Sequence, residues 1–349
     1  MLRTMPGLAV CLVVALATRG APGQDRPQPG RLVARTQWTR LEVVAGRIKI
    51  VPPRLGQRAT LRADQPETGL RESLTLLGDA PTALALRYEF DDRQQHVLVE
   101  AEHEERVSLE RTPVNESGLA SVKYFQRPGE DVRLTVVAGE ETLDRRAPSF
   151  WHLLIDAPDA AYRHLLPLLE GFRPGWRLEA QARQVEESLL AIARSARMPD
   201  TERIQQLLRD LDAPDFQTRQ RADRELRDLG PAVLAYVERL DLGQLGAERR
   251  TRITRIRQTL AGADSDTPSR VALRLAGDPV VWLALLDRED VEKRLLASQR
   301  LALLAGHPVD FDPRAPAAQR RAERQRLEVE LGLHRQVLIG ERSGETRRR

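Results

Sequence analysis

The sequence predicts an α+β protein in which an N-terminal antiparallel β domain, a sandwich or an open barrel, is followed by an all-α array of stacked helices. Two observations lead to this prediction. Apolar and polar residues alternate along much of the chain up to Ala147, which is the period of a strand with one solvated face. Beyond that point apolar residues recur at every third or fourth position, which is the period of an amphipathic helix.

The composition of this 349-residue chain is consistent with two or more folded domains. Aromatic residues make up only 4%, so the cores must consist mainly of Leu, Ala and Val, which let helices approach closely. The lysines are Lys49, Lys123 and Lys293, so the remaining 52 of the 55 basic residues are arginines. These arginines are interleaved with acids, and the formal net charge is +4. We attribute the arginine bias to a GC-rich genome and expect no nucleic-acid binding.

Residues 1–23 have the pattern of a signal peptide that is removed on export. Arg3 gives a basic start, residues 7–17 are apolar, and cleavage is expected after Gly20 or Gly23. The apolar run is too short to anchor the chain across a bilayer, and no later segment of the mature sequence is apolar enough to span one. The predicted location is therefore the periplasm or the extracellular space.

Cys11 is the single cysteine, and it lies inside the predicted signal peptide. A lipid-modified N-terminus is an alternative, but Val10 stands where a lipobox has a small residue. If Cys11 leaves with the signal peptide, the mature chain has no disulfide, no catalytic thiol and no cysteine-ligated zinc. Removal of Arg3 and Arg19 also lowers the formal charge from +4 to +2.

A Pro- and Gly-rich stretch, residues 24–31, is predicted to be a flexible linker before the β domain, residues 32–147. The alternation is clearest on two predicted strands that are joined by a turn at Asp91–Asp92. Their inward-facing residues are Thr82, Leu84, Leu86, Tyr88, Phe90, Val97, Val99 and Ala101. Turn-like residues recur about every 8–12 positions, as in a small sandwich or an open barrel.

Residues 148–199 are predicted to form a helical connector, because the apolar period changes just before Ser149. Ser149 is expected to cap the first helix, and Gly171 is expected to end the second. The expected helices are 150–155, about 160–170 and about 178–196.

The stretch 207–231 has the pattern of two helices joined by a short turn. The first helix carries an apolar stripe, and the second carries another; the stripe residues are Ile204, Leu207, Leu208, Leu211, Ala222, Leu226 and Leu229. We expect Asp212 to cap the second helix and Arg219 to pair with Asp212 or Asp215. Gly230 is expected to end that helix in the left-handed conformation.

This helix pair closely resembles a HEAT-type repeat, the antiparallel helix pair that stacks into solenoids. The resemblance rests on a Leu-rich first helix followed by Asp212, Asp215, Arg219, Ala222 and Leu226. Weaker copies place Arg252 and Arg294 at the position of Arg219, and Arg219 and Arg294 are 75 residues apart, about two repeat periods. The predicted repeats occupy residues 200–262 and, with a loose last copy at 312–331, residues 268–340. The chain thus resembles exported bacterial proteins with divergent repeats, whose stacked pairs would share one continuous apolar seam.

The sequence assigns no catalytic, cofactor-binding or metal-binding residue. It contains no Gly-x-Ser-x-Gly elbow, no phosphate loop and no dinucleotide-binding glycine pattern. A metal cluster of Asp91, Asp92, His96 and His103 across a hairpin is an alternative to ordinary exposed side chains, which we favour. No spacing places Ser117, Ser149 or any histidine in a catalytic triad.

Trp151 and Trp176 flank the junction between the two halves of the chain. We favour packing for both, and an exposed aromatic shelf for a ligand is the alternative. Residues 341–349 end in three arginines and are predicted to be a disordered tail.

We therefore expect a non-enzymatic interaction or scaffold protein that binds a protein partner through the surface of its helical repeats. A glycan- or peptide-binding module that acts through the groove or edge of the β domain is the first alternative. A hydrolase whose site the sequence does not reveal is the second. No cofactor is expected.

Overall fold

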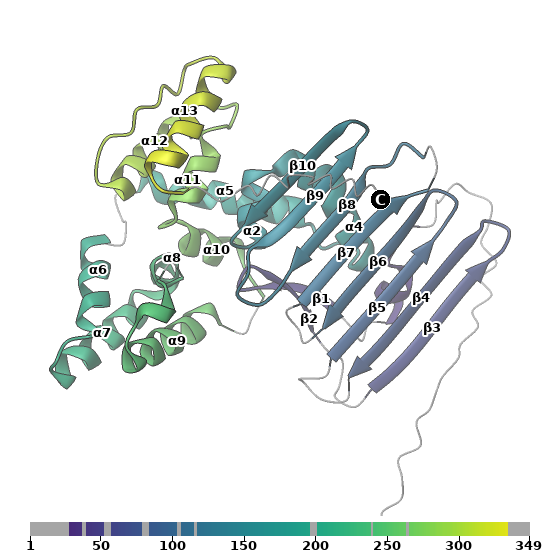
Figure 1. Ribbon diagram of the computed structural model, residues 1–349, viewed down its shortest axis with the longest axis horizontal. Coiled ribbons are helices and arrows are strands. Elements are labelled where there is room, and N and C mark those ends of the chain that lie inside the picture. Colours follow the sequence, from purple (N-terminus) through teal and green to yellow (C-terminus); the bar gives the residue numbers. More distant parts are fainter. Residues whose placement is uncertain are drawn as a thin grey trace, which may run out of the picture.

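The computed structural model describes residues 28–36, 40–51, 57–78, 84–102, 106–114, 117–195, 201–238, 240–262 and 265–333. Within these ranges an antiparallel sheet region precedes a helical region, so the predicted α+β class is confirmed (Figure 1). The predicted signal peptide (1–23) and Arg-rich tail (341–349) lie outside the described residues, as does the first half, 24–27, of the predicted linker (24–31). Among the described helices, none is long and apolar enough to cross a membrane.

Eight strands form one antiparallel sheet in which each strand pairs with the next one along the chain. The strands are β3 (Gln57–Gln65), β4 (Leu70–Gly78), β5 (Leu84–Asp91), β6 (Gln95–Glu102), β7 (Arg106–Pro113), β8 (Ser121–Gln126), β9 (Val132–Ala138) and β10 (Glu141–Ala147). The two edge strands, β3 and β10, do not pair with each other. The sheet is therefore open and is not closed into a barrel.

The predicted alternation holds along the central strands. Tyr88 of β5 lies between Leu74 of β4 and Val99 of β6, and all three side chains are buried. On the opposite face, Arg87 lies opposite Glu100 and pairs with it at 2.9 Å, where both side chains are exposed. One face of the sheet thus belongs to the core and the other is solvated, as a period of two requires.

A separate hairpin, β1 (Arg40–Val44) and β2 (Arg47–Val51), turns at Ala45 and Gly46. Both turn residues have positive φ, 51° and 76°, which is the backbone of the turn that matches the twist of a two-residue hairpin. Gln126 fixes this hairpin to the sheet, because its amide exchanges hydrogen bonds with the backbone N and O of Ile48 at 3.0 and 2.6 Å.

The expected start of strand structure at residue 32 is wrong, because Arg31–Thr36 forms a short helix, α1. Glu72 accepts a hydrogen bond from the backbone N of Leu32 at 2.9 Å and another from the hydroxyl of Tyr88 at 2.8 Å. A carboxylate at the first turn satisfies amides that a helix leaves free. A residue forty positions away therefore stabilises α1, which local periodicity does not reveal.

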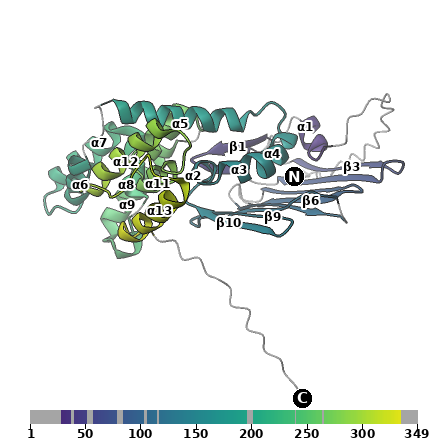
Figure 2. The same ribbon diagram turned by 90° about the horizontal axis from the view of Figure 1, so that it is seen from above.

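The connector consists of α2 (Phe150–Asp156), α3 (Pro158–Ala160), the π-helical turn η2 (Ala161–Leu165), α4 (Leu166–Phe172) and α5 (Leu178–Arg194). Helix α2 and η2 pack on strands of the sheet, whereas α5 packs on α10 and α12. Ser149 caps α2, as predicted. Figure 2 shows α1, α4 and β1 on the same side of the sheet. Edge-to-face ring pairs join the layers: Tyr88 meets Phe172 at 4.9 Å, and Tyr124 meets Phe150 at 6.1 Å.

The C-terminal half is helical, as predicted. Its elements are α6 (Thr201–Asp210), α7 (Phe216–Asp228), η3 (Gly230–Val233), α8 (Leu234–Val237), η4 (Leu242–Gln244), α9 (Ala247–Ala261), α10 (Pro268–Leu275), α11 (Pro279–Leu285), α12 (Val291–Ala305) and α13 (Ala317–Glu330). Among the predicted stripe residues, six are buried: Ile204, Leu207, Leu208, Leu211, Ala222 and Leu226. Leu229 is partly exposed instead, and Gly230 has a φ of 73°, as expected for the end of α7.

The expected single apolar seam is wrong, because the helices belong to two cores. Helices α6 to α9 form a hydrophobic cluster of their own. Buried residues of α10 to α13 instead belong to the cluster that includes the sheet and the connector. Helix α10 packs on α5, so Val271 and Leu275 extend the sheet core rather than the cluster of α6 to α9.

Asp266 joins the helical region to the hairpin and to α2. Its carboxylate accepts hydrogen bonds from the backbone N of Ala45 and Gly46 at 3.1 and 2.7 Å, and from the indole N of Trp151 at 2.7 Å. It also pairs with Arg274 at 3.2 Å. Every partner is a donor, so this buried charge is compensated and ties three elements together.

Candidate functional site

Helix α7 begins with a specific arrangement of an aspartate and an arginine. Asp215, rather than the predicted Asp212, caps α7, because the helix starts directly after Asp215 and its extended backbone turns the carboxylate onto the first free amides. Arg219 folds back on the preceding turn, and its Nη1 donates to the carbonyl oxygens of Ala213 and Pro214, both at 2.8 Å. The turn between α6 and α7 is thereby fixed.

Helix α12 begins in the same way. Asp290 caps the helix, and the Nη1 of Arg294 donates to the carbonyl oxygens of Arg288 and Glu289 at 2.5 and 2.6 Å. Arg294 therefore has the same structural role as Arg219, and the two positions that the sequence pattern aligned are equivalent.

The same position also holds an arginine in α9 and in α13. Arg250 donates to the carbonyl of Leu245 at 2.9 Å, and Arg320 donates to that of Ala315 at 2.6 Å. In both helices the acceptor is the residue before the capping residue. The assignment of Arg252 to this position is therefore wrong by two residues, a difference that only the start of α9 reveals.

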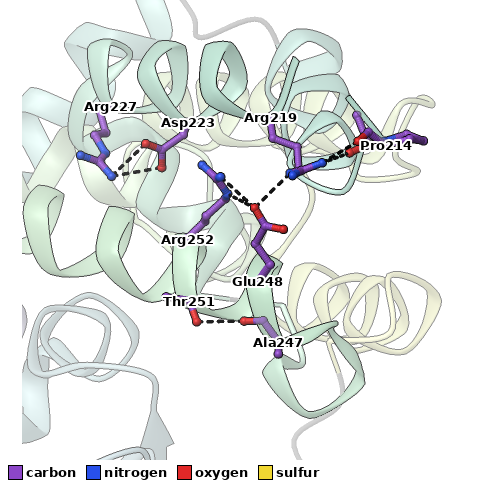
Figure 3. A network of polar contacts seen from close by, with 9 residues as sticks. Pro214, Arg219, Asp223, Arg227, Ala247, Glu248, Thr251 and Arg252 are labelled. Atoms are coloured by element: carbon purple, nitrogen blue, oxygen red, sulfur yellow. Dashed lines mark hydrogen bonds and ion pairs between the residues drawn. The ribbon is translucent and has the colours of Figure 1, made fainter. Parts of the chain in front are cut away.

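A second set of contacts joins α7 to α9 (Figure 3). The Nε of Arg219 donates to Glu248 at 3.0 Å, and the Nη2 of Arg252 donates to the same oxygen at 2.8 Å. Hydrogen bonds from Arg252 and Arg219 hold the pKa of Glu248 below its usual value. The expected pairing of Arg219 with Asp212 or Asp215 is thus replaced by an ion pair between helices, because the carboxylate of Asp215 already caps α7.

Phe216 lies over this ion-pair network. Its side chain is 54% exposed, and the guanidinium groups of Arg219 and Arg252 lie 5.7 and 5.8 Å from its ring centre. Among the described residues it is the only strongly exposed aromatic side chain. We use the name α7–α9 surface for Phe216, Arg219, Glu248, Arg252 and Arg255.

The α7–α9 surface carries three arginines and one acid, around an exposed apolar ring. Glu248, Arg252 and Arg255 lie at i, i+4 and i+7, so they share one stripe of α9. Arg255 is exposed, and no described residue forms a hydrogen bond or ion pair with its side chain. The surface can therefore offer a positive charge and an aromatic contact to another molecule.

The structure brings together a serine, a histidine and an aspartate that the sequence does not connect. The Nδ1 of His152 lies 2.7 Å from the Oγ of Ser149, and its Nε2 lies 3.1 Å from Asp278. Ser149 caps α2, however, and Asp278 caps α11. A Cβ on Gly46 would lie 2.7 Å from the Cβ of Ser149, so the hairpin turn covers this buried serine. The three groups thus connect two helix starts and do not present a nucleophile to a substrate.

The hairpin residues considered for a metal are used in local contacts. His96 and Asp91 pair across the strands at 2.6 Å. Asp92 accepts hydrogen bonds from the backbone of the turn that follows it. His103 lies outside the described residues.

The alternative of an exposed tryptophan shelf at the junction is wrong. Trp151 is buried, and its indole N is bonded to Asp266. Trp176 is also buried, and the guanidinium of Arg173 lies 5.2 Å from its ring centre. Both rings contribute to the core that joins the sheet and the helices, as the packing interpretation predicts.

Comparisons of the chain with protein-family models, with curated proteins and with solved structures give no match. Within the described residues, the α7–α9 surface combines exposure, an aromatic ring and unneutralised charge, which makes it the candidate site for binding another molecule.

Proposed function

We propose that this chain is an exported, non-enzymatic interaction protein that binds a protein partner through the α7–α9 surface of a divergent HEAT-like repeat. The observation that carries the proposal is the exposed ring of Phe216 next to two guanidinium groups. Aromatic and arginine side chains are enriched at the centres of protein interfaces, where they contribute most of the binding free energy. A partner with an acidic contact surface would complement the excess of arginine.

The matched contacts of Arg219 and Arg294 support the repeat assignment. Each belongs to the second helix of a pair of consecutive, contacting helices, α6–α7 and α11–α12. Export is inferred from the sequence of residues 1–23 alone. Mass determination of the mature N-terminus from an envelope or culture-medium fraction tests it, with a chain that begins after Gly20 or Gly23 as the expected result.

The binding proposal is tested by comparing variants of the immobilised mature chain. Wild type, Phe216→Ala and Leu303→Ala are incubated with an envelope extract, and bound proteins are quantified by mass spectrometry. Leu303 is the matched control, because it is an exposed apolar residue on α12, away from the α7–α9 surface. We expect at least one protein that wild type and Leu303→Ala retain equally and that Phe216→Ala retains about tenfold less, which is about 1.4 kcal/mol.

Two further outcomes decide the proposal. Retention of that protein should fall at high salt, because the contact includes exposed charges. Equal retention by Phe216→Ala and wild type, with both chains equally folded, refutes the α7–α9 surface as the binding site. Retention on a polysaccharide column without any protein partner would favour a glycan-binding module instead.

A further inference from the structure

A cavity of about 430 Å³ lies where the edge of the sheet meets the last helices. Its walls are β10, the helices α2 and α11, and one face of α13. Pockets of this size at the junction of two structural layers are common sites for ligands.

One wall of the cavity is a strand edge. Residues 144–147 of β10 line it, and β10 is the terminal strand of the sheet, with β9 as its only strand neighbour among the described residues. Arg321, Arg324, Gln325 and Glu328 of α13 form another wall. A groove between an edge strand and a helix can accept an extended peptide, which adds a strand to the sheet through main-chain hydrogen bonds.

In the inner part of the groove, the charged side chains already neutralise one another. Arg324 pairs with Asp156 at 2.7 Å and also with Asp287. Burial alone would lower the pKa of Arg324, but the two carboxylates raise it above its usual value, so the guanidinium remains charged. The side chains of Val280 and Ala284 supply an apolar floor beside this network.

Two charged side chains on α13 remain available. Arg321 and Glu328 both line the cavity, and neither side chain forms a hydrogen bond or ion pair with another described residue. They are seven positions apart, which places them about 10 Å apart along the helix axis at 1.5 Å per residue. Arg321 and Glu328 therefore place a positive and a negative group at the two ends of the α13 wall, and Arg145 and Arg146 of β10 add positive charge on the strand side.

We propose that the groove between β10 and α13 binds a short extended peptide that carries one acidic and one basic side chain. The peptide backbone pairs with the edge of β10, its acidic side chain meets Arg321, and its basic side chain meets Glu328. Along an extended chain, a separation of about 10 Å corresponds to a step of three residues. A step of four residues places both charged side chains on the same side of the strand, and the flexibility of these side chains accommodates the difference in length. This site is distinct from the α7–α9 surface, so the two proposals stand or fall separately.

The test uses the mature chain and the probe peptide acetyl-Asp-Val-Thr-Val-Lys-amide, in which Asp, Thr and Lys project to one side of a strand. Hydrogen exchange with and without the peptide shows where it binds, and a titration gives the affinity. We expect slower exchange at the amides of β10 and no change at β3, the opposite edge of the sheet. The neutral peptide acetyl-Asn-Val-Thr-Val-Gln-amide should bind about tenfold more weakly.

Matched variants of α13 test the two charges. Arg321→Gln and Glu328→Gln should each weaken binding of the charged peptide about fivefold. Arg326→Gln and Glu330→Gln are the controls, because these residues are on α13 but do not line the cavity, and they should change binding less than twofold. All four variants should melt like wild type, which separates loss of binding from loss of folding.

Three results overturn the proposal. The first is unchanged exchange at β10 when the peptide saturates the protein. The second is equal binding of the charged and neutral peptides. The third is binding that begins only after residues 334–349 are removed, because the occupant of the groove would then be a segment of this chain rather than another peptide.

Discussion

Replacement of Leu226 by alanine tests whether α6 to α9 form a core of their own. Leu226 is fully buried in the cluster that contains Ile204, Leu211, Ile253 and Ile256. The substitution removes three carbon groups, which lose about 0.8 kcal/mol each on transfer to water, or about 2.4 kcal/mol together. The cavity left behind raises the expected loss of unfolding free energy to about 3–4 kcal/mol.

Two spectroscopic probes distinguish the two cores in this experiment. The described tryptophans, Trp151, Trp176 and Trp282, all belong to the core that includes the sheet. Far-UV circular dichroism reports all helices, whereas tryptophan fluorescence reports mainly the sheet core. We expect Leu226→Ala to lower the denaturant midpoint of part of the circular-dichroism signal and to leave the fluorescence midpoint nearly unchanged.

The control is Leu229→Ala on the same helix, because Leu229 is 39% exposed and its loss should cost less than about 1 kcal/mol. A loss below about 0.5 kcal/mol for Leu226→Ala would contradict the burial argument. Equal shifts of both signals would refute independent cores. Such coupling would have to pass through contacts between the cores, such as the close approach of Tyr236 to Gly277.

Two further variants test single buried groups. Burial raises the pKa of Glu72 despite hydrogen bonds from Leu32 and Tyr88, so the folded state holds this proton more tightly than the unfolded state, whose pKa is near 4.5. The contribution of Glu72 to stability is therefore fully present below about pH 4.5 and is lost as the pH rises through the folded pKa. Glutamine does not titrate, so Glu72→Gln removes this fall in stability with rising pH. In denaturation curves, the free energy of unfolding of the variant relative to wild type should therefore increase as the pH rises through the folded pKa of Glu72. A difference between the two proteins that does not depend on pH would contradict the argument. Arg294→Ala should lower the free energy of unfolding by about 2 kcal/mol in the same assay, because three carbonyl groups lose a charged donor. Arg294→Lys should not restore this stability, because a single ammonium group does not reproduce the planar set of guanidinium donors. Arg255→Ala, which removes an exposed and unbonded arginine, should change stability by less than about 0.5 kcal/mol; a cost equal to that of Arg294→Ala would refute the assignment of a structural role to Arg294.

The parts of the candidate site differ in how far the sequence predicts them. The equivalence of Arg219 and Arg294 follows from their local surroundings, because each lies four positions after a capping aspartate. The partner of Arg219 does not, since Glu248 is on another helix and comes close only when α7 packs against α9. The exposure of Phe216 is also a tertiary property, because an aromatic residue at the start of a helix is equally compatible with burial.

The peptide groove proposed between β10 and α13 has no local signal at all. Arg321 and Glu328 belong to an ordinary charged helix, and their relation to β10 arises because α13 returns to the sheet edge. The same holds for Ser149, His152 and Asp278, which come from two segments more than a hundred residues apart. Pairing at such separations depends on the order of strands and helices, and no short-range pattern specifies that order.

The amino-acid sequence by itself determined the α+β fold class, the alternation of the central strands, the N-cap at Ser149 and the end of α7 at Gly230. These features depend on side-chain period and backbone preference, which act within a few residues. Only the tertiary structure decided that the sheet stays open, that Arg31–Thr36 is a helix and that the array has two cores. Those outcomes depend on which distant surfaces exclude water together: the carboxylate of Glu72 accepts a hydrogen bond from the first turn of α1, and α10 buries its apolar face mainly on α5.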